Sequence, residues 1–102
     1  DAPKRVHIPR ELNLALVGER TIVYSDLDYN NHMNNTNYPD MLCDFVPDMV
    51  GRRVASLGIS FAHEARLGEV LKVYMTESAG MYYFRTVRSD GQINVEAIMT
   101  LE

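Results

Sequence analysis

The polar and apolar positions along the chain divide it into one helical stretch and several strand-like runs. Residues 38–46 carry apolar side chains at spacings of three and four, the period of a helix with one buried face. A short β-rich run at residues 21–24 predicts a strand before that helix. Four further runs are β-branched, aromatic or alternating, and they predict strands at residues 54–63, 70–76, 82–87 and 93–101.

Punctuating residues indicate where these elements begin and end. Pro39 fits only the first turn of the helix, with Asn35 or Asn37 as its cap, and Pro47 ends it. Asp90-Gly91 predicts a two-residue hairpin. The order is therefore strand, polar loop, helix and four strands joined by tight turns. This order predicts an α+β domain whose helix packs on one face of an antiparallel sheet.

Length and composition indicate a single globular domain. The chain has 102 residues, of which 46% are hydrophobic, so a core is expected. Residues 1–20 mix charges with two prolines, and we expect them to be a lead-in or interdomain linker to a folded domain at residues 21–102. Because the chain begins at Asp1 rather than at Met, we expect a piece of a longer protein.

Charge, hydropathy and cysteine content narrow the functional classes. A net charge of −4 does not favour a nucleic-acid surface. No apolar run approaches the ~20 residues of a membrane span, and no signal peptide is visible. The single cysteine, Cys43, permits no internal disulfide and fits a reducing compartment. We therefore expect a cytoplasmic protein without a membrane span, from a bacterial cell.

The densest chemistry lies between Asp26 and Asn35, immediately before the predicted helix. These ten residues include two carboxylates, a histidine and four asparagines. A helix start presents unpaired N–H groups and a positive dipole end, which can stabilise an oxyanion that develops on a carbonyl group. A carboxylate or histidine beside it can activate water or attack directly. An ordinary capping loop is the alternative, since Asp and Asn favour turns and caps.

The same loop fits a metal site poorly. Asp26, Asp28 and Asn30 have the first spacings of a calcium loop, but Asn31 stands where glycine is needed and Asn37 where a bidentate Glu is needed. The three histidines and the lone cysteine lack the spacing of zinc ligands. We therefore expect neither a metal nor another cofactor.

The run from Asp26 to Asn35, continued by Tyr38, resembles the Asp-Leu-Asp-x-Asn-x-His-x-Asn-Asn-x-x-Tyr signature of the plant and bacterial acyl-carrier-protein thioesterases. Residues 60–65, Ser-Phe-Ala-His-Glu-Ala, resemble that family's second active-site strand. The likeness runs from about residue 21 to the C-terminus. It implies a hotdog fold, in which an antiparallel sheet wraps around one central helix. It also implies that this chain is the C-terminal, catalytic hotdog half, without the N-terminal half that largely forms the acyl pocket.

The resemblance implies a set of catalytic residues as well. Asp28, Asn30 and His32 match the family's catalytic Asp-x-Asn-x-His, and Glu64 matches its catalytic acid on the following strand. In one mechanism Asp28 or Glu64 activates water, His32 orients it and Asn30 holds the substrate. In another, a carboxylate attacks and forms an anhydride. Ala65 stands where the plant enzymes typically have a cysteine, which favours a carboxylate-based mechanism.

Neighbouring residues are expected to support this set. We expect Asn34 and Asn35 to order the loop and cap the helix, which places the oxyanion-binding amides. Asp26 is expected to tie the loop down by accepting bonds from backbone N–H groups. His63 should point away from its catalytic neighbour if both lie on one strand. Cys43 falls within the apolar spacing of the helix and is expected to be a buried structural thiol.

The function that the resemblance implies is hydrolysis of fatty acyl-carrier-protein thioesters, linked through 4′-phosphopantetheine, to free fatty acid and the free carrier. An acyl-CoA thioesterase of the same fold and a non-catalytic module that binds acyl thioesters or dimerises are the alternatives. We expect the N-terminal half of the parent protein as a partner, and a homodimer when this half is alone. Candidate docking residues for an acidic carrier protein are the arginines at 52, 53, 66, 85 and 88, together with Lys4, Arg5 and Arg10 at the start of the chain.

Overall fold

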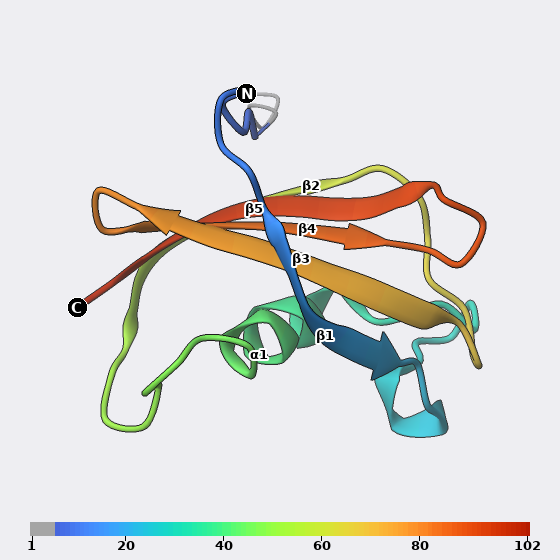
Figure 1. Ribbon diagram of the computed structural model, residues 1–102. Coiled ribbons are helices and arrows are strands. Elements are labelled where there is room, and N and C mark those ends of the chain that lie inside the picture. The colour runs from blue at the N-terminus through green and yellow to red at the C-terminus, as the bar shows by residue number, and fades with distance from the viewer. Residues whose placement is uncertain (1–5) are drawn as a thin grey trace, which may run out of the picture.

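The computed structural model describes residues 6–102, which form one antiparallel sheet with a short helix against one face (Figure 1). Five strands pair in the order β1-β3-β4-β5-β2, so β1 and β2 are the two edges. The helix α1 spans Tyr38–Cys43 and follows the 3₁₀ turn η2 at Asn35–Asn37, while η1 at Tyr24–Asp26 follows the first strand. The strands are β1 (Ala15–Thr21), β2 (Val54–Phe61), β3 (Val70–Ser78), β4 (Met81–Val87) and β5 (Ile93–Leu101).

The α+β fold class and the four strands after the helix are confirmed. Each of these strands ends within two residues of its predicted bounds. The hairpin at Asp90-Gly91 is also present, but its loop is longer than two residues. Arg88 N–H donates to Gln92 O over 2.8 Å and Gly91 N–H to Arg88 O over 2.9 Å, with Gly91 at φ 87°. A turn followed by a left-handed glycine is the usual three-residue hairpin loop.

The prediction for the first strand was wrong. Residues 15–20, which were assigned to the lead-in, form β1 together with Thr21, whereas the rest of the predicted strand at 21–24 runs into the turn η1. Most side chains of β1 are exposed, so the strand lacks the apolar alternation that marks a half-buried strand. Pairing with β3 through the backbone holds it instead. Residues 1–5 of the predicted lead-in lie outside the described residues.

The helix is shorter than its apolar period predicted. Pro39 lies in the first turn as expected, but α1 ends at Cys43, before Val46. Asn37, one of the two predicted caps, is the N-cap residue, but its side chain makes no cap hydrogen bond. Instead Asn34 caps the preceding turn η2, because its side-chain oxygen accepts from Thr36 N–H over 3.0 Å. No helix within residues 6–102 is long and apolar enough to cross a membrane.

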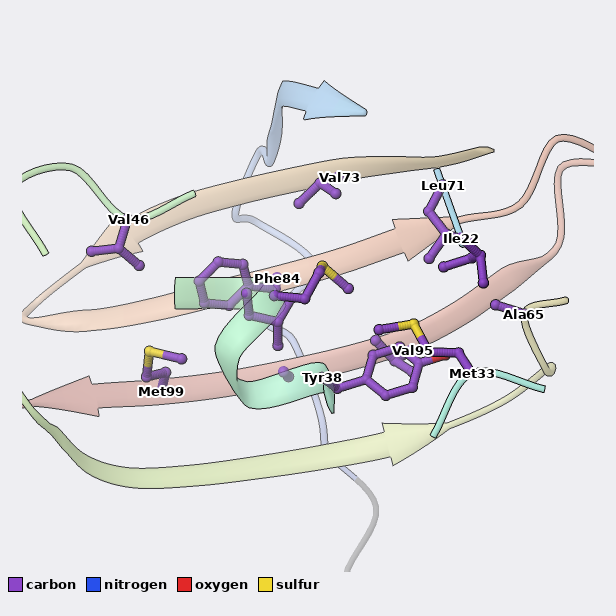
Figure 2. Close-up of a cluster of buried hydrophobic side chains, with 13 residues drawn as sticks. Ile22, Met33, Tyr38, Val46, Ala65, Leu71, Val73, Phe84, Val95 and Met99 are labelled. Carbon is purple, nitrogen blue, oxygen red and sulfur yellow. The ribbon is translucent and has the colours of Figure 1, made fainter. Parts of the chain in front are cut away.

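A buried cluster joins the helix to the sheet (Figure 2). Tyr38, Met41 and Leu42 of α1 are each at most 2% exposed. Burial of such side chains is worth about 1.5–3 kcal/mol each, so this cluster fixes the helix and the loop that precedes it. The sheet contributes Leu71, Val73, Phe84, Val95, Ala97 and Met99, and the connecting segments contribute Ile22, Met33, Val46 and Ala65.

We expect Leu42→Ala to lower the free energy of unfolding by about 2–5 kcal/mol, since it leaves a cavity between helix and sheet. Leu42 is fully buried, whereas Val50 is fully exposed in the loop after the helix. Val50→Ala is therefore the control and should change stability by no more than about 0.5 kcal/mol. Urea unfolding of both variants measures the difference. Equal effects would show that the helix is not packed as described.

Candidate active site

The polar loop after β1 folds as a tight turn around Asp28. Its Oδ1 accepts from the N–H groups of Asn30 and His32, over 2.9 and 3.3 Å. Its backbone N–H donates to His32 O over 2.9 Å, and Asn31 adopts φ 63°, a conformation that asparagine tolerates. The hydrogen bonds of residues 6–102 leave Oδ2 of Asp28 without a partner. Oδ1 thus stabilises the loop by hydrogen bonds, and Oδ2 is free to accept a proton or contact a ligand.

Asp26 anchors this loop to β1 and is only 4% exposed. Arg20 donates to both carboxylate oxygens, over 2.7 and 2.9 Å, and Val23 N–H donates over 2.9 Å. The hydrogen bonds from Arg20 lower the pKa of Asp26 to about 2, against burial, which raises it. The predicted bond from Asp26 to backbone N–H is confirmed at Val23, whereas the pair with Arg20 was not predicted. Because Arg20 occupies both oxygens, Asp26 is available neither as a base nor as the first ligand of a calcium loop.

The second predicted motif, residues 60–65, lies beside this loop in the folded structure. His32 Nε2 lies 3.1 Å from Glu64 Oε2, although the two residues are far apart in the chain. The backbone also joins the two segments, since Met33 N–H donates to Ala65 O over 2.8 Å and His32 forms an isolated antiparallel bridge with Arg66. Glu64 was expected on a strand, but β2 ends at Phe61, so Glu64 lies in the segment that follows.

Asp28, His32 and Glu64 line one cavity of about 330 Å³. Two of its walls are aromatic: the rings of Tyr38 and Phe61 meet edge to face with their centroids 5.3 Å apart. Carboxylates and an imidazole therefore line a partly apolar cavity, an arrangement that can bind an apolar ligand and supply a general base. The remaining lining residues are Met33, Asn35, Ala62, His63 and Ala65.

The three predicted asparagines lie at different places. Asn35 lines the cavity, and its backbone N–H has no hydrogen-bond partner among residues 6–102. Asn34 orders the loop through Thr36, as described above. Asn30 is exposed and borders a neighbouring depression with His32 and Arg66, outside the cavity that holds both carboxylates. The cavity thus brings together Asp28, His32, Glu64 and Asn35, whereas Asn30 contacts Asp28 through its backbone N–H and does not line the cavity.

His63 and Glu64 do not lie on one strand, so the condition for the expected opposite orientation of His63 is not met. Strand alternation cannot separate it from Glu64, because both residues follow the end of β2. His63 lines the same cavity, and its Nδ1 lies 2.9 Å from the carbonyl oxygen of Ile93. A histidine of unassigned role therefore borders the site.

Sequence reasoning missed Asn94 altogether. This residue is 1% exposed, and its Nδ2 donates to Tyr38 Oη over 3.1 Å and to His63 O over 2.6 Å. Its Oδ1 accepts from the hydroxyl of Thr86 over 2.9 Å. In the sequence Asn94 occupies a polar position of the alternating run in β5, the pattern of a solvent-facing residue. No local signal marks it as buried.

Cys43 does not line the cavity and is partly buried. Burial raises the pKa of its thiol, and the charges of Asp40 and Asp44 raise it further. A thiol in such surroundings is a poor nucleophile at neutral pH. The structural role expected for Cys43 agrees with this position.

Most of the arginines proposed for carrier docking have partners within the domain. Arg85 pairs with Glu96 over 2.7 Å, and Arg88 pairs with Asp90 over 2.6 Å. Arg53 approaches Glu102 over 3.2 Å, while Arg52 lies beside the ring of Tyr82. Arg66 borders the depression next to His32.

The antiparallel sheet with one helix is a hotdog fold, as comparison with solved structures shows. The chain superposes on an acyl-ACP thioesterase from Bacteroides thetaiotaomicron with a TM-score of 0.78 at 20% identity, over 100% of this chain and 44% of that one. The superposition on a Staphylococcus aureus protein in complex with CoA has a TM-score of 0.74 at 18% identity. It covers 88% of this chain and 77% of that one. The superposition on a 1,4-dihydroxy-2-naphthoyl-CoA thioesterase from Synechocystis has a TM-score of 0.69 at 14% identity. It covers 84% of this chain and 80% of that one.

The sequence belongs to the acyl-ACP thioesterase family, because the model of its C-terminal domain matches residues 13–102. The resemblance drawn from the two motifs is thereby confirmed. A curated relative is the chloroplastic dodecanoyl-[acyl-carrier-protein] hydrolase of Cinnamomum camphora, 32% identical over 71% of this chain and 20% of that protein. The chain thus spans a fifth of that relative and under half of the Bacteroides thioesterase.

We expect the domain to lose about 2 kcal/mol of stability through Asp26 alone as the pH falls from 5 to 2. The folded-state pKa of about 2 lies below the ordinary value of 3.8, so the unfolded chain binds the proton first and stability falls with pH in this window. In Asp26→Asn this part of the pH dependence should disappear, as urea unfolding at several pH values would show.

Asp48→Asn is the matched control, because Asp48 is exposed in a loop and asparagine tolerates its φ of 56°. The Asp48 variant should keep the wild-type slope. An unchanged slope in the Asp26 variant would contradict the role of the Arg20–Asp26 pair.

Proposed function

We propose that the parent protein hydrolyses fatty acyl thioesters carried on acyl carrier protein, and that this chain supplies the catalytic residues. The observation that carries the proposal is the contact between His32 and Glu64, 3.1 Å apart, in the cavity that Asp28 also lines. Family membership supports thioester hydrolysis. The carrier-protein substrate is supported by the name of the Cinnamomum relative.

The chemistry begins with a base that takes a proton from water as the water oxygen attacks the thioester carbonyl carbon. Glu64 is 59% exposed and contacts His32, so the pair can hold a water molecule by hydrogen bonds at the mouth of the cavity. Asp28 supplies a second carboxylate, through the oxygen that the loop does not use. When the C–S bond breaks, the protonated base returns its proton to the departing thiolate.

A direct attack by a carboxylate is the second route. In that route Glu64 or Asp28 forms a mixed anhydride and expels the thiol, and water then cleaves the anhydride. Both routes need no thiol in the site. This agrees with Ala65 at the position of the plant cysteine and with Cys43 outside the cavity.

The backbone N–H of Asn35 is the donor that we propose for the oxyanion. It stands at the start of the turn that leads into α1, at the cavity, and no group of residues 6–102 accepts from it. A fixed donor at the oxygen where charge develops is worth roughly 10²–10³ in rate in related chemistry. Asn35 therefore acts through its backbone, and its side chain is dispensable in this proposal.

An acyl-CoA substrate is the second candidate, favoured by the likeness to the Staphylococcus protein in complex with CoA. Both substrates present the same thioester at the end of a pantetheine arm, so the residues of the cavity do not distinguish them. Turnover of matched acyl-CoA and acyl-carrier-protein thioesters, with the same acyl chain, separates the two candidates.

We expect Asp28→Ala and Glu64→Ala in the parent protein each to lower kcat by about a hundredfold or more, the size of a lost general base. The assay follows hydrolysis of medium- and long-chain acyl-carrier-protein thioesters. Glu19→Ala is the control, since Glu19 is an exposed carboxylate on β1 and does not line the cavity. It should retain wild-type turnover.

Protein integrity is checked for each variant by circular dichroism and unfolding. A folded Glu64→Ala with wild-type turnover would remove Glu64 from the mechanism. An inert wild type on every acyl thioester would leave the non-catalytic binding module as the function.

We expect the isolated chain to self-associate through the edge of β2. This strand has one neighbour in the sheet, and Val54 and Phe61 along it are 37% and 46% exposed. Val54→Lys should weaken the association, whereas Val50→Lys in the exposed loop should leave it unchanged. Light scattering at micromolar concentration measures both. A wild-type chain that is monomeric under these conditions would contradict the prediction.

A further inference from the structure

We propose that the hairpin formed by β4 and β5 positions Glu64 for catalysis through two polar side chains, Asn94 and Arg88. The inference rests on the proposed function, because it concerns the same cavity. It adds two positioning residues that do not themselves touch the reacting atoms. Neither residue belongs to the two motifs that identify the family.

The segment that carries Glu64 lacks the support of a strand. β2 ends at Phe61, so residues 62–64 leave the regular ladder just before the carboxylate. The side chain of Glu64 is 59% exposed, and its one ion pair within residues 6–102 is with His32. An exposed side chain with one contact is located mainly by its backbone. What holds the backbone of residues 62–64 therefore decides where the carboxylate lies.

Asn94 holds this segment from the buried side. Its backbone oxygen accepts from the N–H groups of Ala62 and His63, over 2.9 and 3.3 Å, and its Nδ2 donates to His63 O over 2.6 Å. The same amide nitrogen donates to Tyr38 Oη over 3.1 Å. One buried amide thus links the Glu64 segment to α1, which follows the Asp28–His32 loop. Fixing both segments on one group fixes their separation.

The amide of Asn94 is itself held in one orientation. Its oxygen faces the hydroxyl of Thr86, which donates over 2.9 Å and in turn accepts from Val95 N–H over 3.1 Å. Its nitrogen must then face Tyr38 and His63. Breaking a buried polar network of this kind leaves polar groups without hydrogen-bond partners, which is unfavourable away from water. The network therefore resists displacement of the Glu64 segment.

Arg88 holds the next residue from the surface side. Its Nη1 donates to Glu64 O over 3.1 Å, while Nη2 donates to Asp90 over 2.6 Å. Asp90 lies in the hairpin loop and is a second partner of the guanidinium, independent of the bond to Glu64 O, and Glu69 lies 3.9 Å from its Nε. Every carbonyl from His63 to Ala65 is thereby bonded: His63 O to Asn94, Glu64 O to Arg88 and Ala65 O to Met33.

The consequence for catalysis follows from geometry. A displacement of about 1 Å of a reacting group can cost 10²-fold in rate without a change in chemistry. If the hairpin positions Glu64, loosening it must lower kcat through Glu64 and leave substrate binding nearly unchanged. A residue that only stabilises the fold would not act through Glu64 in particular.

The sharpest test uses Arg88→Met and Asp90→Asn in the parent protein. Both substitutions remove the ion pair in the hairpin loop, but only the first removes the bond to Glu64 O. We expect Arg88→Met to lower kcat roughly tenfold or more with KM within about twofold, and Asp90→Asn to stay near wild type. In a Glu64→Ala background the Arg88 substitution should have no further effect on kcat, because coupled residues are not additive.

Asn94→Ser is the second variant, with Thr86→Val as its stability control. Both lose bonds of the buried network, but Thr86→Val leaves intact the two bonds from the amide nitrogen of Asn94. Unfolding gives the stability cost of each, and amide hydrogen exchange reports the Ala62 and His63 N–H groups. We expect faster exchange at these two amides in Asn94→Ser than in Thr86→Val at equal global stability.

Three results would overturn the proposal. The first is an equal loss in Arg88→Met and Asp90→Asn, and the second is an Arg88 effect of the same size in the Glu64→Ala background. The third is unchanged exchange at Ala62 and His63 in a folded Asn94→Ser. If wild type is inert on every thioester, the proposed function fails while the exchange measurement still decides whether Asn94 holds the segment. If Asn94→Ser does not fold, the comparison of Arg88→Met in the wild-type and Glu64→Ala backgrounds decides by itself whether the hairpin positions Glu64.

Discussion

The ion pair between Arg20 and Asp26 is the contact on which the site depends. It ties the end of β1 to the loop that carries Asp28 and His32, with two charge-assisted bonds of 2.7 and 2.9 Å. The backbone oxygen of Asp26 also accepts from Asn34 N–H over 2.7 Å, which connects Asp26 to the start of η2. A buried carboxylate is costly without a partner, so losing Arg20 would leave Asp26 unpaired and destabilise this conformation of the loop.

The three carboxylates near the cavity have different roles because their surroundings differ. Asp26 is buried against an arginine, which depresses its pKa and occupies both of its oxygens. Asp28 uses one oxygen to shape the loop, and Glu64 stands largely in solvent beside His32. The same functional group thus serves as anchor, as loop former and as proposed base. Neighbours and exposure, rather than residue type, separate these roles.

The helix connects the loop that carries Asp28 and His32 to the rest of the fold through Tyr38. Its ring is buried among the core residues and stacks edge to face on Phe61, while its hydroxyl accepts from Asn94. One side chain therefore contributes to the core, to a wall of the cavity and to the polar network behind Glu64. This explains how a helix of only six residues can locate a site: packing and one hydrogen bond fix it where length does not.

Local patterns in the sequence were enough for the family, the α+β class, the four later strands and the bond from Asp26 to backbone N–H. These features rest on periodicity, on turn residues or on a contiguous motif, which act over a few neighbours in the chain. The tertiary structure alone decided that residues 15–21 pair as β1, that the helix ends at Cys43 and that His63 lies on the cavity side. It also decided that Glu64 reaches His32 and that Asn94 is buried behind both segments. Each of these depends on contacts between residues distant in the chain, whose energies leave no periodic or local trace in the sequence.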